Sequence, residues 1–215
     1  MRRLICRIVA RDNPIARKLL LIGALLHCGA IGLQAQARQE QNVPAASRFE
    51  LAITYSSVNA GQVYSKQFWM NGGGIEIAAR IHRSLSVAVN FTGLHTSNTG
   101  TGVPLNLVTS TFGPRYTWTT GRRSSNGHSL SIFGEGLVGE ACGFNSLFPG
   151  SSGVDSSSNS PAVQAGGGVE IALSRHLSVH AVQASWLRTQ LPNSSTNVQN
   201  DFQIGAGFVF HSADR

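Results

Sequence analysis

Hydrophobic and polar residues alternate with a period of two in segment after segment between residues 49 and 210. This period predicts β-strands with one apolar face, because successive side chains of a strand point to opposite sides. The clearest segments are 49–56, 75–81 and 85–92, and further strands are predicted at 105–119, 129–141, 162–173, 177–189 and 201–210. The pattern therefore predicts an all-β protein with eight strands.

Two of the predicted strands contain an irregularity. The fourth includes Gly113-Pro114, which a central strand tolerates poorly without a bulge. In the seventh, the alternation slips near Gln183 to Trp186, as expected where one extra residue is inserted. Both strands are therefore expected to bend or bulge locally.

The predicted connections alternate in length along the chain. Longer ones of about ten residues or more separate strands one and two, three and four, five and six, and seven and eight, and the largest is the Gly/Ser-rich stretch from Cys142 to Pro161. Shorter ones are His82–Ser84, Thr120–Gly127 and Ser174–His176. Long loops on one side, short turns on the other and an even strand number are typical of an up-and-down outer-membrane barrel.

An internal repeat supports this strand count. The segment Gly72-Gly-Gly-Ile-Glu-Ile-Ala78, followed by Arg83-Ser-Leu-Ser-Val87, recurs as Gly166-Gly-Gly-Val-Glu-Ile-Ala172, followed by Arg175-His-Leu-Ser-Val179. The two copies are hairpins that lie four strands apart, so an eight-stranded barrel would place them on opposite walls. Duplication and convergence on a common hairpin pattern both explain the likeness.

The first 37 residues indicate export, and the rest of the chain indicates how it could cross a membrane. Residues 1–37 contain a basic stretch, an apolar run and the small-residue motif Ala35-Gln36-Ala37, the three parts of a cleaved secretory signal. The rest contains no apolar run long enough for a membrane helix, which needs about 20 residues. A closed barrel is the other way to satisfy the backbone in lipid. The chain is therefore predicted to be a transmembrane β-barrel.

The basic charge of the chain belongs largely to the predicted signal. Residues 1–37 hold six of the 17 Lys and Arg residues but one of the ten acids, so the remainder has a net charge of only +2. Nucleic-acid binding, which requires a basic face on the folded domain, loses its main support.

Charged residues within the strands are the main candidates for the barrel interior. Their faces are otherwise rich in Gly, Ala and Ser and suit the crowded lumen of a small barrel. An isolated charge there would be costly, so acids and bases are expected to pair. The predicted lumen network consists of Glu50, Glu76, Arg80, Arg115, Glu135 and Glu170. It could close the lumen or form the constriction of a narrow gated pore.

Catalytic and cofactor motifs are sparse. His82-Arg-Ser84 and His176-Leu-Ser178 each place a His and a Ser two residues apart, a spacing that could make a nucleophile and its base. Both pairs lie at predicted turns. The sequence has no metal-ligand spacing and no phosphate-binding loop, so no cofactor is expected.

Aromatics near strand ends are predicted to form interfacial girdles; they are Tyr55, Phe68, Trp69, Tyr116, Trp118, Phe208 and Phe210.

The signal, the Gly-rich hairpins, the Phe112-Gly-Pro-Arg-Tyr116 segment and the aromatic terminal strand make the chain resemble OmpA-type small outer-membrane β-barrel proteins. In that family the last strand is similar to the signal read by the barrel-insertion machinery. The resemblance implies that role for Phe202, Phe208 and Phe210. One departure is the segment 211–215, since the family often ends at its terminal Phe.

Together these observations predict four parts: a signal peptide (1–37), a short N-terminal segment (38–47), an outer-membrane barrel (48–210) and a periplasmic tail (211–215). The expected function is a structural or surface-interaction role with a plugged, charged lumen, and a narrow solute pore and a lipid-modifying enzyme are the alternatives. Expected partners are outer-membrane lipids, the barrel-insertion machinery and an extracellular ligand that contacts the loops.

Overall fold

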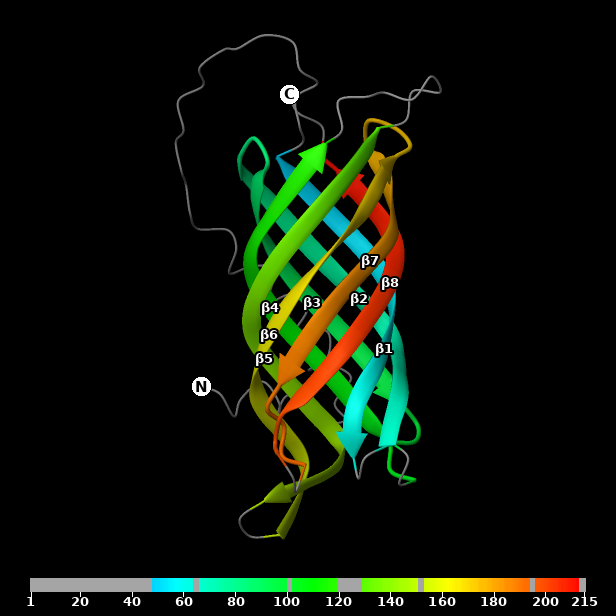
Figure 1. The fold of residues 1–215 in the computed structure, drawn as a ribbon, viewed down its shortest axis with the longest axis vertical. Coiled ribbons are helices and arrows are strands. Elements are labelled where there is room, and N and C mark those ends of the chain that lie inside the picture. Colours follow the sequence, from blue (N-terminus) through cyan, green and yellow to red (C-terminus); the bar gives the residue numbers. More distant parts are fainter. Residues whose placement is uncertain are drawn as a thin grey trace, which may run out of the picture.

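Eight antiparallel strands close into a barrel (Figure 1). The computed structural model describes residues 48–63, 66–99, 102–119, 129–150, 153–193 and 196–212. Each strand pairs with its neighbours in sequence, and β1 pairs with β8 to complete the circle. The predicted signal peptide with Ala35 and Ala37, and the segment 38–47, lie outside the described residues. No described helix is long and apolar enough to cross a membrane.

The eight strands correspond one to one with the predicted segments. They are β1 (Phe49–Val63), β2 (Lys66–His82), β3 (Leu85–Thr96), β4 (Leu105–Thr119), β5 (Leu130–Gly150), β6 (Gly153–Ala172), β7 (Leu177–Thr189) and β8 (Gln199–His211). The end of the barrel at which β1 begins and β8 finishes is called the turn end, and the opposite end is called the loop end. β8 runs one residue past the predicted barrel boundary and includes His211.

Two predicted loops at the loop end are wrong, because their residues extend the strands instead. β1 continues to Val63 and β2 begins at Lys66, so their ladder replaces most of the expected loop. The stretch from Cys142 to Pro161 forms the outer parts of β5 and β6, which pair as far as Gly150 and Gly153. This hairpin projects beyond the other strands (Figure 1).

The irregular strands behave differently from each other. β4 is continuous through Gly113-Pro114, although its pairing with β5 is interrupted between Phe112 and Arg115. β7 bulges just before the predicted stretch, since its register with β8 shifts between His180 and Gln183. The bulge keeps the inward-facing residues of β7 on the inside along its whole length.

Around the turn-end half of the barrel, apolar side chains face outward. Large exposed examples occur on every strand; they include Leu51, Ile77, Val87, Phe112, Ile132, Val163, Val182 and Phe208. Their strand neighbours are buried and small or polar, such as Ala52, Glu76 and Ser86. This apolar-out arrangement is that of a membrane barrel, in which lipid replaces water around the wall.

The loop-end half of the lumen contains an apolar core. Its buried members, here called the outer apolar cluster, are Val58, Ala60, Phe68, Met70, Leu94, Leu107, Ala141, Phe148, Ala162, Leu187 and Leu191. Phe68 was predicted to belong to an outward girdle, and that prediction is wrong because its ring points into this cluster. The other six girdle residues have large exposed fractions.

Candidate functional site

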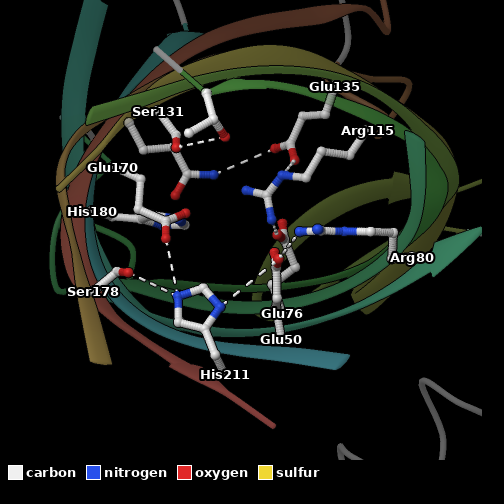
Figure 2. A network of polar contacts seen from close by, with 12 residues as sticks. Glu50, Glu76, Arg80, Arg115, Ser131, Glu135, Glu170, Ser178, His180 and His211 are labelled. Carbon is white, nitrogen blue, oxygen red and sulfur yellow. Dashed lines mark hydrogen bonds and ion pairs between the residues drawn. The ribbon is translucent and has the colours of Figure 1, made fainter. Parts of the chain in front are cut away.

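A charged network occupies the turn-end half of the lumen, between the outer apolar cluster and the turn end. Its centre is Arg115 of β4, whose guanidinium lies 2.5 Å from Glu76 Oε1 and 3.4 Å from Glu135 Oε2 (Figure 2). The two carboxylates come from β2 and β5, so one cation connects three strands. The three side chains are almost fully buried. Pairing offsets the large cost of placing such charges away from water.

Neutral neighbours complete this central group. Gln183 donates to Glu135 Oε1 at 3.3 Å, and Asn90 donates to Glu76 Oε2 at 3.3 Å. The Arg115 guanidinium carbon lies 3.9 Å from the centroid of the Phe133 ring, a cation–π contact. The guanidinium is thus held in its plane by carboxylates and on one face by a ring.

A second group lies nearer the turn end and is more accessible. Arg80 donates to Glu50 Oε1 at 2.9 Å, and His211 Nδ1 lies 3.8 Å from the same oxygen. The side chains of these three residues are 11–19% exposed, compared with 0–4% for the central group. The network therefore becomes gradually more accessible toward the turn end.

Glu170 of β6 connects this second group, through His211, to His180 on β7. Its Oε1 lies 3.1 Å from His211 Nε2, and its Oε2 lies 3.6 Å from His180 Nε2. His180 also stacks on Phe133, with ring centroids 4.9 Å apart. Because Phe133 contacts both His180 and Arg115, it joins the two groups into one network.

Sequence comparison identifies the family. Residues 23–210 match the sequence profile described as the outer membrane protein beta-barrel domain. The chain belongs to this family. It is therefore a protein of the bacterial outer membrane, in agreement with the apolar outer wall.

Several solved structures are similar to this outer-membrane barrel. Neisserial surface protein A is similar with a TM-score of 0.61 and 16% identity, over 78% of this chain and 99% of that chain. Ail of Yersinia pestis, solved with the heparin analogue sucrose octasulfate, has a TM-score of 0.49 and 15% identity, over 77% and 99%. OprG from Pseudomonas aeruginosa has a TM-score of 0.49 and 9% identity, over 80% and 100%. A search of curated proteins returned no relative.

The six charged residues predicted for the lumen all face inward in this outer-membrane barrel. Five of them pair acid with base: Glu50 with Arg80, and Glu76 and Glu135 with Arg115. Glu170 instead approaches two histidines. The repeat places Glu76 and Glu170 at equivalent positions of β2 and β6, four strands apart.

Sequence reasoning missed His180 and His211. The alternation of β7 could have revealed His180, because it lies two residues after the inward-facing Ser178. His211 lies beyond the last aromatic residue and was expected in the tail. It directly continues the inward series of β8, two residues after the buried Val209.

The predicted His-x-Ser pairs do not form a site. Ser178 is buried, and its Oγ lies 2.7 Å from His211 Nε2, whereas His176 is an exposed turn residue. His82 and Ser84 lie at the turn between β2 and β3. Among the described residues, no group of three or more His, Cys, Asp or Glu could hold a metal ion.

The predicted insertion-signal residues share the outer face of β8. Phe202, Phe208 and Phe210 all have large exposed fractions and alternate with inward-facing neighbours. Their rings are therefore part of the apolar outer wall, on the strand that pairs with β1 to close the barrel.

Proposed function

We propose that this outer-membrane barrel has a structural or surface-interaction role and that its lumen is closed by its own side chains. Two groups of buried side chains at different levels of the lumen support the proposal. Arg115 and its two carboxylates join three strands in the turn-end half, and the outer apolar cluster lies in the loop-end half. An eight-stranded barrel is narrow enough for side chains to fill it.

Planar-bilayer recording of the purified barrel tests this proposal. A lumen filled at both levels passes few ions, so we expect no steady single-channel currents. Large, steady currents from the wild-type protein would contradict a closed lumen. A variant with Met70, Leu107 and Leu187 replaced by alanine serves as a comparison, because it removes bulk only from the outer apolar cluster.

A narrow solute pore is the second candidate. The observation that favours it is the partial exposure of Glu50, Arg80 and His211, which makes the turn end of the lumen accessible and charged. A pore through this group would carry cations and anions unequally. Glu50→Gln would change the ratio of cation to anion permeability. Absence of any current in either protein would argue against the pore.

An enzymatic role has little support from the lumen geometry. Ser178 and His211 have the contact expected of a nucleophile and its base, but the Ser178 side chain is 1% exposed and lies inside the barrel. A lipid substrate would meet the outer wall, where the described residues are mainly apolar. We therefore propose a non-enzymatic function without a cofactor.

The projecting β5–β6 hairpin supports an interaction with an extracellular ligand. It carries the exposed apolar residues Leu147 and Val154 among serines and glycines, and exposed apolar groups on a projecting element favour contact with a partner. Cells that display the L147S/V154S variant should adhere less to host-cell or matrix surfaces than cells that display the S156A control. Equal adherence would contradict this role.

Two further partners follow from the outer wall. Outer-membrane lipids would surround the apolar side chains of the turn-end half. The insertion machinery would read Phe202, Phe208 and Phe210, which form an outward aromatic series on the terminal strand.

A further inference from the structure

The polarity of the barrel wall reverses along its length. On β1, outward Leu51, Ile53 and Tyr55 are followed by outward Ser57 and Asn59. About ten residues from the turn end, the outward series becomes polar on most strands, a length that matches the 9–11 residues of a transmembrane strand.

The inner face changes in the opposite sense at the same level. Outward Asn71 is next to inward Met70, and outward Arg188 is next to inward Leu187, whereas nearer the turn end outward Ile77 is next to inward Glu76. The loop-end half therefore has the apolar-inside, polar-outside arrangement of a water-soluble barrel. The reversal marks where the apolar belt ends and lipid headgroups begin.

A row of polar side chains crosses β1 to β4 at this boundary. Ser57 pairs in register with Asn71, Asn71 with His95, and His95 with Asn106. Ser57 Oγ donates to Asn71 Oδ1 at 2.8 Å, and His95 Nδ1 lies 2.8 Å from Asn106 Oδ1. These four residues, here called the polar platform, carry hydroxyl, amide and imidazole groups on an outward surface.

Aromatic rings and glycines border the polar platform. Tyr55 and Trp69 point outward with 65% and 54% of their surface exposed, one on each side of the row. Between Tyr55 and β4, the register partners Gly73 and Gly93 leave the wall without side chains. A Cβ at Gly93 would have no atom within 4 Å, so this part of the wall is flat and open.

We propose that the polar platform binds the sugar headgroup of an outer-leaflet glycolipid. Amide, hydroxyl and imidazole groups exchange hydrogen bonds with sugar hydroxyls, and exposed rings pack against the C–H faces of a sugar. The platform contains no acid, lysine or arginine, so it suits the sugars better than the phosphates of such a lipid. Outer-membrane barrels place their short turns in the periplasm, which puts the loop end outside the cell. The polar platform then lies next to the apolar belt on its extracellular side, at the level of the headgroups.

Intrinsic fluorescence can test this binding directly. Trp69, Trp118 and Trp186 are the three tryptophans of the chain, so the W118F/W186F variant reports on Trp69 alone. Titration of the detergent-solubilised protein with lipopolysaccharide core oligosaccharide freed of lipid should produce a saturable change in Trp69 emission. The same titration of W118F/W186F/N71A/H95A should show affinity weaker by about tenfold, as expected for the loss of one or two hydrogen bonds.

Asn200 provides a matched control, because it is an exposed amide on β8 outside the polar platform. W118F/W186F/N200A should keep the affinity of its parent. No saturable change in the parent, or an equal loss in the Asn200 and Asn71/His95 variants, would overturn the proposal.

A second measurement separates sugar recognition from recognition of phosphate and acyl chains. The barrel is reconstituted in phospholipid vesicles that contain either lipopolysaccharide with its core sugars or lipid A alone, and its thermal unfolding is followed. Core sugars should raise the unfolding temperature above that in lipid A, and N71A/H95A should abolish this difference while N200A keeps it. Equal unfolding temperatures of the wild type in the two lipids would overturn the proposal.

Discussion

His211 Nε2 lies 2.7 Å from Ser178 Oγ, which connects the last residue of β8 to the beginning of β7 inside the lumen. The same histidine lies 3.1 Å from Glu170 on β6, and its backbone amide donates to His176 in the β6–β7 turn at 3.0 Å. The next residue, Ser212, donates its backbone amide to Phe49 on β1 at 3.0 Å. His211 and Ser212 therefore fasten the end of β8 to β6, β7, the turn between them and β1.

Replacement of His211 should weaken this closure. H211A leaves Ser178 and Glu170 with fewer partners in the lumen, and an unsatisfied buried polar group costs about 1–3 kcal/mol. We expect a lower free energy of unfolding in urea, measured in lipid vesicles. H176A is the control, since His176 is an exposed turn residue whose backbone accepts the bond. Equal stability of H211A and wild type would contradict the role of His211.

Removal of the central cation should be more damaging. R115L leaves Glu76 and Glu135 buried without their shared guanidinium, and breaking a buried ion pair in this way costs about 3–5 kcal/mol. The triple variant R115L/E76Q/E135Q carries no unpaired charge and should recover much of the lost stability. Urea unfolding measures both changes, and a triple variant no more stable than R115L would show that the charge imbalance is not the cause.

The outer apolar cluster should contribute to stability as a soluble core does. Leu187 is fully buried there, so L187A should lower the free energy of unfolding by about 2–5 kcal/mol through lost contacts and the cavity left behind. L147A removes the same side chain from an exposed position of the β5–β6 hairpin and should change stability little. If L187A lowered the free energy of unfolding no more than the small change expected for L147A, the outer apolar cluster would add no stability.

Close strand packing should make Gly72 difficult to replace. A Cβ at Gly72 would lie 1.9 Å from the backbone oxygen of Gly93, so G72A requires β2 and β3 to shift. Gly93 lies on the neighbouring strand β3, and G93A adds its methyl to open space, since a Cβ there would have no atom within 4 Å. The yield of folded barrel, seen as heat-modifiable mobility on gels, should fall for G72A and remain near wild type for G93A. Equal yields would show that the strands adjust without cost.

The terminal aromatic series should affect assembly rate. Phe210 faces outward at the end of β8, so F210A should reduce the fraction of protein that reaches the outer membrane in a folded form. F112A removes an outward aromatic of similar exposure from β4 and controls for lost lipid contact. Heat-modifiable mobility and membrane fractionation report the outcome, and an equal defect in both variants would argue against a special role for Phe210.

Alternation in the sequence was sufficient to define the eight strands and the side of each strand that faces lipid. It placed Glu76 and Arg115 on inward faces and predicted the bulge of β7 within a few residues of its position, because the period-two pattern is a local property of each strand. It also predicted a loop at Cys142–Pro161 where β5 and β6 continue. Ser- and Gly-rich sequence looks like a loop in isolation, but here the two segments satisfy each other's backbone hydrogen bonds.

By itself, then, the sequence determined the strand count, the apolar belt and the set of inward charges. Only the tertiary structure decided which charges meet, because contacts across a lumen depend on the register of strands that are distant in sequence. It brought Glu170 to His180 and His211, and it drew His211 into the barrel. The tertiary structure also decided where the polarity of the wall reverses. Leu187 can point into the outer apolar cluster only because the other strands close the barrel and most of them supply apolar partners.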